Sequence, residues 1–486
     1  MNSRWRRALR ATGTPLALAL FGCAVGPNFH APPAPGVPDY IRADQAPPAE
    51  ELAKSAQQTL PGTQLSAQWW QLFRSPPLQQ VVQQGLAGSP TLAAADATLA
   101  EAREAVAVAR GALFPHIQVG GGVQHSSSTS PGPLPLNEYT LGPSASYALD
   151  VFGGARRGVE QQSALAQQQR YQLAAAYLTL TGGIVNEALS IASTRLQLST
   201  TEELIQSDRK NLALTEREFE VGTAARSDVL TADSQLAADL TQLPTLRQQL
   251  SQARDALAVL LGQAPAQAQL HDFDVKEFTV PAQIPLSLPS ELVRQRPDIL
   301  AAEAQLHADS AAIGVAVAQQ FPTLTLSAAI TRSALQAGDL FHQFDTLRTA
   351  GGTLAAPIFA GGALRAQVRA ARDAYQAQRD TYEATVIEAL GQVTDDLWAL
   401  EYDAERLEVD RHAVDIASEA LKLQQASYAV GRTNVLQLID AERTYAQQRL
   451  ALVTAQIQQL QDSAGLLVAL GGAWWQDAAD PASHGN

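Results

Sequence analysis

Few residues of this sequence have a type and a spacing that could carry out chemistry. The 486 residues include one cysteine (Cys23), one methionine (Met1) and eight histidines. No pair of histidines has the spacing of metal ligands, no serine or cysteine stands near a candidate base, and no glycine-rich segment has the pattern of a phosphate loop. A lone cysteine excludes an intrachain disulfide and a metal site built from several thiolates. We therefore expect no catalytic residue, no metal and no cofactor, and a protein that is not an enzyme.

Cys23 is the residue whose position indicates a covalent modification. Residues 1–22 carry four arginines and then a short apolar stretch that cannot span a bilayer, which is the pattern of a signal peptide. The tetrapeptide LFGC that ends at Cys23 resembles the lipobox, where bacterial lipoproteins are cleaved and acylated on the cysteine. Acyl chains such as palmitate would anchor the mature chain by burying methylene groups in one leaflet. The alternative is a thiol that merely follows a signal peptide. Ala24, which is not acidic, is typical of lipoproteins sorted to the outer membrane.

Composition narrows the class of partner and of fold. The formal net charge of −14 argues against a nucleic-acid partner, because phosphate binding needs a clustered basic surface. Charged residues make up only 17%, and long stretches rich in alanine, glutamine and leucine favour long helices. The glycine runs 120–122 and 351–352 fall inside predicted strands, where a bend or a crowded wall explains them. Asp395 and Asp396 fall on a predicted helix as a solvated or lumen-facing pair.

The sequence contains the same unit twice. Pro90 and Phe114 of the first unit match Pro297 and Phe321 of the second, and both gaps are 24 residues. Three further matches keep the offset at 207 to 209: residues 151–154 with 358–362, 219–222 with 428–431, and 257–262 with 466–471. This constant offset predicts a duplication. The chain then divides into a signal peptide (1–22), a lipidated N-terminal segment (23–88), a first repeat (89–288), a second repeat (289–472) and a C-terminal tail (473–486).

Two strands are predicted in each repeat, from alternation of apolar and polar residues. Leu324, Leu326, Ala328 and Ile330 alternate with threonine and serine, and residues 139–150 show the same pattern. The four predicted strands are 116–124, 139–150, 321–331 and 348–358. About ten residues with one apolar and one polar face is the length of a membrane-spanning β-strand. A half-buried strand of a soluble sandwich shows the same alternation.

The number of strands has a consequence for assembly. Lipid excludes open sheet edges, and small membrane barrels begin near eight strands. One chain with four strands therefore cannot close a barrel. If these strands span a membrane, several copies of the chain must share one barrel.

The remainder of each repeat predicts a long helical hairpin, over 154–262 and 362–470. Roughly 65 residues without proline in each first arm would make a helix on the order of 100 Å long. Apolar residues step by three and four as in a coiled coil. They are Val386, Leu390, Val393, Leu397, Leu400, Ala404 and Leu407 on one arm and Leu450, Val453, Ile457, Leu460, Ala464 and Leu467 on the other. Pro244 should bend the first returning arm.

Taken in order, short motifs along the chain resemble the OprM and NodT branch of TolC-like outer-membrane factors, which are outer-membrane lipoproteins of RND-type efflux systems. They are the lipobox, VGPNF (25–29), WWQLF (69–73), RPDI (296–299), FP (321–322) and PIFAGG (357–362). Each motif is short, but their order on a duplicated frame is specific, and the resemblance covers nearly the whole mature chain.

The resemblance implies an α+β membrane protein of the cell outer membrane that is anchored by lipid and extends into the periplasm. It implies a homotrimer with one shared twelve-stranded β-barrel, continued by a coiled-coil α-barrel. The implied function is the passive channel of a tripartite efflux system that exports small molecules such as drugs. The implied partners are a periplasmic adaptor and an inner-membrane pump, often of the RND type.

The resemblance also places the adaptor contacts at the two hairpin tips, which are Val221, Gly222, Thr223, Val430, Gly431 and Arg432. Each tip glycine is also what a tight turn between antiparallel helices requires, whether or not a partner docks. Relatives commonly narrow the periplasmic mouth with acidic residues just beyond the second tip. This chain has Thr433 and Asn434 there, with Asp228 and Asp440 nearby, so the sequence assigns no gate residue.

Three alternatives stay open at this point. The chain could serve a protein secretion system, a metal efflux system, or a structural role as an envelope lipoprotein. Because Met1 is the only methionine, the chain lacks the thioether ligands with which proteins bind Cu(I), so specific coordination of copper or silver is not expected. A purely structural coiled coil would not need the alternating strands.

Overall fold

A computed structural model describes residues 24–37, 39–41, 57–63, 65–126 and 136–472. The signal peptide, Cys23 and the tail 473–486 lie outside the described residues. The chain forms two compact units. Unit 1 comprises Met1–Pro33, Ala97–Arg170 and Ala301–Ala384, and unit 2 comprises Ala34–Asp96, Tyr171–Leu300 and Thr385–Asn486. The units do not coincide with the sequence repeats, because each contains parts of both.

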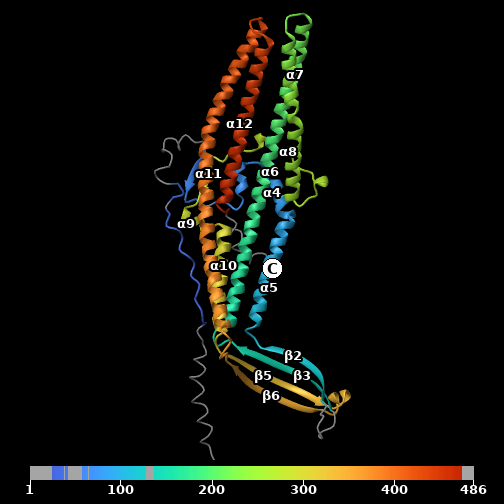
Figure 1. Ribbon diagram of the computed structural model, residues 1–486, viewed down its shortest axis with the longest axis vertical. Helices are drawn as coiled ribbons and strands as arrows, with labels where there is room; N and C mark the ends of the chain where they lie inside the picture. Colours follow the sequence, from blue (N-terminus) through green and yellow to red (C-terminus); the bar gives the residue numbers. More distant parts are fainter. Residues whose placement is uncertain (1–23, 38, 42–56, 64, 127–135, 473–486) are drawn as a thin grey trace, which may run out of the picture. The chain divides into compact units, whose positions relative to one another are not determined.

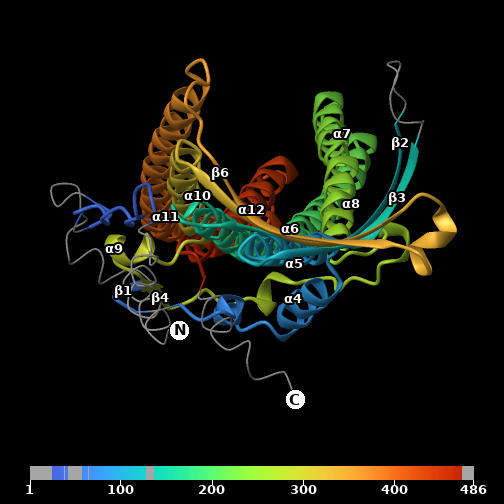
Figure 2. The same ribbon diagram turned by 90° about the horizontal axis from the view of Figure 1, so that it is seen from below.

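Unit 1 holds a four-stranded antiparallel sheet in the order β2-β3-β5-β6 (Figure 1). The strands are β2 (His116–Ser126), β3 (Leu136–Leu149), β5 (Thr323–Ala334) and β6 (Asp345–Ala355). Each repeat supplies one hairpin, and β3 pairs with β5 where the repeats meet. The sheet is bent rather than flat (Figure 2).

The register places most of the large apolar residues of the four strands on one face, although Leu347 lies on the other and Arg332 and Arg348 share the apolar one. Ile117 lies opposite Ala145, Ala145 opposite Ala328, and Ala328 opposite Ala350. Because side chains alternate along a strand, the same face also carries a larger set. It includes Val119, Val123, Tyr139, Tyr147, Leu149, Leu324, Leu326, Ile330 and Leu354. The opposite face is rich in serine, threonine and glutamine, as the alternation predicted.

The strand limits differ from the predicted ones at the proline and aspartate positions. Pro322 and Pro357 lie outside β5 and β6, since proline cannot donate to a ladder and is tolerated at strand ends. Asp150 lies beyond β3, where its carboxylate accepts hydrogen bonds from the backbone N–H groups of Ala155 and Arg156, both at 3.0 Å. It therefore caps the next helix instead of continuing the strand.

Helices adjoin the sheet in sequence. α5 (Pro90–Gly111) and α10 (Pro297–Ala318) precede the two hairpins, and each has 22 residues. Both begin with proline, whose missing N–H costs nothing in the first turn. α6 (Gly154–Glu220) and α11 (Ala363–Ala429) follow the hairpins, have 67 residues each and continue into unit 2. Within the described part of the chain, no helix combines the length and apolar character needed to cross a membrane.

Unit 2 contains the two helical hairpins. In the first, α6 returns through α7 (Arg226–Leu240) and α8 (Gln242–Leu260); in the second, α11 returns through α12 (Val435–Ala469) (Figure 1). The bend predicted near Pro244 is a break at Thr241, because α8 begins anew with Pro244 in its first turn. The predicted coiled-coil pattern on α11 is confirmed by burial of Val386, Val393, Leu400 and Leu407 at steps of seven.

The core of unit 2 includes a segment for which the sequence predicted no structure. Trp69 and Phe73, in a 3-10 helix at Trp69–Phe73, are fully buried against α6, α8 and α12. α4 (Pro76–Gly88) packs Leu78 into the same core. The short strands β1 (Gln58–Pro61) and β4 (Gln283–Leu286) pair in parallel. The remaining short elements are α9 (Pro289–Leu292) and 3-10 turns at Pro265–Gln267, Val275–Glu277 and Ala337–Phe341.

Candidate functional site

The six predicted adaptor-contact residues lie in the two turns that join the arms of the helical hairpins. Gly222 has a φ of 81° and Gly431 a φ of 70°, which is the left-handed region where glycine is favoured. A Cβ added to either glycine would meet no atom within 4 Å. Val221 and Val430 next to them are exposed. The turn conformation requires the glycines, and the exposed valines leave an apolar surface; contact with an adaptor stays a prediction.

The polar residues just beyond the tips cap the returning helices. Asp228 accepts a hydrogen bond from the N–H of Ala225 at 2.9 Å, and Asn434 accepts one from the N–H of Gln437 at 3.0 Å. Asp440 is exposed on α12. Asn434, which departs from the acidic pattern of relatives, therefore has a structural role as an N-cap.

A buried charged cluster that the sequence did not reveal connects three helices of unit 2. Asp239 on α7 is fully buried and forms an ion pair with Arg443 on α12, with Oδ1 and Nη2 3.3 Å apart. Asp208 on α6 is 4% exposed, and its Oδ2 accepts no hydrogen bond from the described residues. On α12, Glu442 accepts hydrogen bonds from Ser207 and Asn211 of α6. The cluster therefore ties both arms of the first hairpin to α12.

The electrostatics of this cluster favour a proton on Asp208. Burial, together with the neighbouring Asp239 carboxylate, raises the pKa of Asp208 from 3.8 to about 7, although Arg443 opposes the shift. A proton on Asp208 would let its otherwise unpartnered oxygen donate to Asp239. With the proton on Asp208, the negative charge of Asp239 is balanced by the positive charge of Arg443.

We expect the contacts between α6, α7 and α12 to weaken as pH rises through about 7. An acid whose pKa is raised by folding contributes stability that is complete below its unfolded pKa and lost as pH passes the folded value. Hydrogen exchange of these helices, corrected for the intrinsic pH dependence of exchange, should show protection that falls from about pH 4 and levels off above about pH 7. Asp208→Asn should flatten this dependence, whereas Asp233→Asn, at an exposed position on α7, should not. An unchanged profile in Asp208→Asn would assign the effect to other groups.

A second group of acidic residues comprises Asp396 and Asp403 on α11 and Asp462 on α12. Burial and the charge of Asp462 raise the pKa of Asp403 to about 7, and the same two causes raise the pKa of Asp396 to about 6. Asp395 is exposed and Asp396 is half-buried, so the two neighbours, predicted as a solvated or lumen-facing pair, differ in their exposure. No group of three or more potential metal ligands occurs among the described histidines, aspartates and glutamates.

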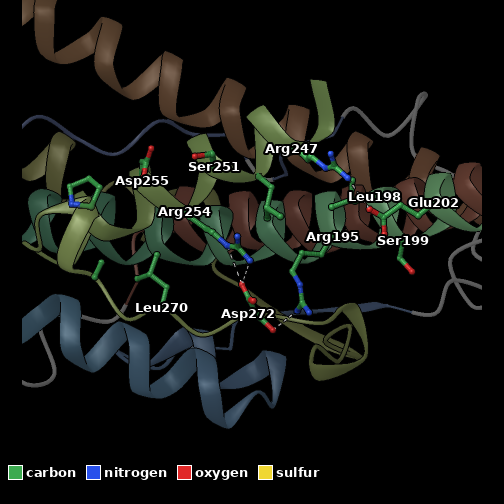
Figure 3. Close-up of a pocket in the computed structure, with 13 residues that line it drawn as sticks. Arg195, Leu198, Ser199, Glu202, Arg247, Ser251, Arg254, Asp255, Leu270 and Asp272 are labelled. Atoms are coloured by element: carbon green, nitrogen blue, oxygen red, sulfur yellow. Dashed lines mark hydrogen bonds and ion pairs between the residues drawn. The ribbon is translucent and has the colours of Figure 1, made fainter. Parts of the chain in front are cut away.

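A polar hollow of about 780 Å³ lies in unit 2 (Figure 3). Arg254 bonds to Asp272 through Nε at 3.1 Å, Arg195 donates to the carbonyl of Phe273 at 2.8 Å, and Arg247 faces Glu202 at 3.4 Å. Two of the acidic residues that line the hollow, Glu202 and Asp272, thus pair with arginines, and Asp255 also lines it. The three arginines in this hollow already have partners in the chain.

In unit 1, the segment that follows Cys23 is held by a buried arginine. Arg157 on α6 is 4% exposed, and its guanidinium donates to the carbonyl of Val25 at 3.2 Å and to Oδ1 of Asn28 at 2.7 Å. Gly26 packs directly on Gly314 of α10, where a Cβ would collide with the backbone. Phe29 stacks on His307 of α10 with ring centroids 4.5 Å apart. This explains the VGPNF motif as an anchoring segment, which the sequence could not show because its partners are distant in the chain.

A carboxylate completes this anchoring cluster. Glu160 accepts hydrogen bonds from Arg157 at 2.6 Å and from His307 at 3.1 Å. Burial alone would raise the pKa of Glu160, but these two hydrogen bonds outweigh it, so the pKa is lowered. The carboxylate therefore remains charged opposite Arg157.

Comparison with known proteins agrees with this architecture. The profile of the family described as "Outer membrane efflux protein" matches residues 81–263 and 288–472. The pyoverdine export outer membrane protein OpmQ of Pseudomonas aeruginosa is 30% identical over 421 residues, which is 84% of this chain and 88% of OpmQ. Nodulation protein T of Rhizobium leguminosarum bv. trifolii is 28% identical over 96% of this chain and 98% of its own length.

Solved structures extend the agreement to three dimensions. The outer-membrane channel OprN matches with a TM-score of 0.82 and 26% identity, over 93% of this chain and 100% of the OprN chain. The duplicated strands and the long helical hairpins agree with the family match and with the fold of OprN. The chain belongs to the outer membrane efflux protein family and is an efflux channel of the outer membrane.

Proposed function

We propose that three copies of this chain form one passive duct, with a shared twelve-stranded barrel in the outer membrane and helical hairpins in the periplasm. The observation that carries the proposal is the four-stranded sheet with one apolar face and two open edges. Such a sheet is stable in lipid only when its edges are paired, and within the described part of the chain no further strand pairs with either edge. Three copies supply twelve strands, which is within the range of known membrane barrels.

The proposed duct works with a periplasmic adaptor and an inner-membrane pump. The pump would select the cargo, and this chain would conduct it. Two relatives are named for what they export: OpmQ for pyoverdine, and ArpC of Pseudomonas putida for antibiotics. Both are exporters of small molecules, so small organic compounds are the cargo class that we propose here.

We also propose that Cys23 carries acyl chains. Val25, two residues later, is fixed to unit 1 by Arg157 and by a hydrogen bond from its N–H to the carbonyl of Phe152 at 3.0 Å. Phe152 follows the end of β3. Two residues span about 7 Å at most, so the two hydrogen bonds that hold Val25 would keep the lipid attached to Cys23 close to the strand ends.

The ion pair between Asp239 and Arg443 is our candidate for a latch that holds the periplasmic end closed. It joins α7 of the first hairpin to α12 of the second, and Asp239 has no access to solvent in the chain. Moving the hairpins apart would break the ion pair and leave the Asp239 carboxylate either exposed to water or buried without its cation. Opening of the periplasmic end must therefore disrupt this contact.

One purification tests assembly, lipidation and conduction together. The chain is extracted from outer membranes in detergent and examined by native mass spectrometry and in planar bilayers. We expect a trimer mass, acyl chains on a mature N-terminal Cys23, and ion conductance. A Cys23→Ser variant should lose the lipid mass. A monomer with intact β-structure would contradict the shared barrel, and trimers that never conduct would contradict the duct.

A further inference from the structure

The described sheet ends in an unpaired strand on each side. β2 and β6 are the outer strands and pair on one side only (Figures 1 and 2). In lipid, the free N–H and C=O groups of these edges need partners from another strand. The identity and register of those partners can be derived from the duplication of the chain.

A stacked pair of phenylalanines marks the place where the two repeats meet. Phe152 follows β3 and Phe321 precedes β5, and their ring centroids are 4.6 Å apart with an angle of 21° between the planes. The duplication relates Phe152 to Phe359 and Phe321 to Phe114, both at an offset of 207. Phe359, after β6, is 90% exposed, and Phe114, before β2, is 67% exposed. Each open edge therefore carries half of a pair that the opposite edge would complete.

We propose that β6 of one copy pairs with β2 of the next copy in the register that β3 and β5 use inside the chain. Phe359 would then stack on Phe114 of the next copy. This inference rests on the shared barrel proposed above and specifies the residues that meet at each junction between copies. A second copy is the occupant because only it presents the complementary edge.

The register follows from the observed pairing by arithmetic. β3 and β5 pair Tyr147 with Leu326. Adding 207 to the first position and subtracting 207 from the second places Leu354 opposite Val119 of the next copy. Both side chains lie on the apolar face, and they are 69% and 73% exposed in the single chain. Two exposed apolar residues would thus become a cross-strand pair.

The same register aligns the glycines of the two edge strands. It places Gly351 opposite Gly122 and Gly352 opposite Gly121 of the next copy. In the single chain a Cβ added to Gly351 would meet no atom within 4 Å, whereas one added to Gly121, Gly122 or Gly352 would meet an atom of the neighbouring strand at 3.3 to 3.4 Å. The alignment of the glycines follows from the register and does not by itself require glycine at the junction.

The two hairpins differ in register, which defines a competing arrangement. β2 and β3 pair His116 with Ser146, whereas β5 and β6 pair Thr323 with Ala355, two residues beyond the position that an offset of 207 gives. If β6 is instead matched to β3 through the hairpin registers, the offset between them is 209. Leu354 would then lie opposite Gly121 of the next copy. The phenylalanines favour the register that places Leu354 opposite Val119. They flank the strands that would meet, and their offset is 207 at both positions.

Cysteine pairs in the full-length chain distinguish these registers. Leu354→Cys is combined in turn with Ile117→Cys, Val119→Cys or Gly121→Cys, and membranes are oxidised mildly before denaturing electrophoresis. Directly opposed residues bring the Cβ atoms within disulfide range, whereas a shift of two residues does not. We expect covalent dimers and trimers chiefly with Val119→Cys. The pair Tyr147→Cys with Leu326→Cys is the matched control, which should form a disulfide within one chain and no larger species.

The native mass of each double-cysteine variant, measured before oxidation, separates the possible failures. Unsubstituted chains, with Cys23 alone, should stay uncross-linked under the same oxidation. Trimers that cross-link best through Ile117→Cys or Gly121→Cys would overturn the proposed register while leaving the shared barrel intact. Trimers with no cross-link at any of the three positions would show that β6 and β2 do not meet. Absence of trimers would overturn the shared barrel and this inference together.

Discussion

Replacement of both Gly222 and Gly431 by valine is expected to abolish efflux while trimers persist at near-normal abundance. Both glycines have positive φ angles, of 81° and 70°, and a β-branched residue in that region costs about 1–2 kcal/mol or more. No neighbouring atom would collide with the new side chain, so the cost comes from the backbone of the turn. The long helices bury far more surface than one turn contributes. The tips should therefore change shape while the hairpins survive, and cells should regain sensitivity to an exported dye.

The asparagine variants Gly222→Asn and Gly431→Asn are the matched control, because asparagine adopts left-handed backbone conformations more readily. They should retain efflux and cross-linking to the adaptor. Unchanged efflux in the double valine variant would show that docking lies elsewhere. Efflux lost only in proportion to missing trimer would leave these glycines with a purely structural role.

Removal of the Arg443 side chain should open the periplasmic end. Arg443→Ala leaves the fully buried Asp239 without its cation, and breaking a buried pair in this way costs about 3–5 kcal/mol. Because the Arg443 side chain is 25% exposed, we expect a lower cost of about 2–3 kcal/mol. This shifts the opening equilibrium by roughly 30- to 150-fold. Planar-bilayer recordings should show a correspondingly higher open probability.

Arg449→Ala on the same helix is the control for loss of an arginine. Arg449 and Glu203 are 3.6 Å apart and both substantially exposed, so their pair contributes little. Combining Asp239→Asn with Arg443→Ala removes the stranded charge, and this double variant should lose less stability than Arg443→Ala alone. If Arg443→Ala conducts like the unsubstituted channel, the ion pair is not a latch.

The features that the sequence predicted correctly depend on neighbours close in the chain. Strands follow from alternation at a period of two, as at Leu324 and Leu326, and tip turns follow from a glycine between two helical patterns. The duplication is itself a property of the sequence. Strand ends were less well predicted, because Asp150 and Pro357 had to be assigned either to a ladder or to the turn that follows it.

Contacts between distant segments could not be predicted in this way. Arg157 looks like any arginine on a helix, yet it binds Val25 and Asn28 more than a hundred residues away. Trp69 and Phe73 belong to a motif to which the sequence assigned no element or contact, and they form part of the unit 2 core. One sequence shows residue types and spacing but not which surfaces meet.

The repeats, the elements and the two faces of each element follow from the order of residues alone, whereas which of these faces are covered depends on tertiary packing. Equivalent positions of α6 and α11 show the difference. On α6 the polar residues Thr201, Asp208 and Thr215 are buried, whereas on α11 the apolar residues Val409, Ile416 and Leu423, 208 residues later, are exposed. Hydrophobic pattern alone predicts the reverse. Burial depends on what packs against a helix face, and for Asp208 that is Asp239 and the neighbouring helices, whose hydrogen bonds and charges compensate for the loss of water.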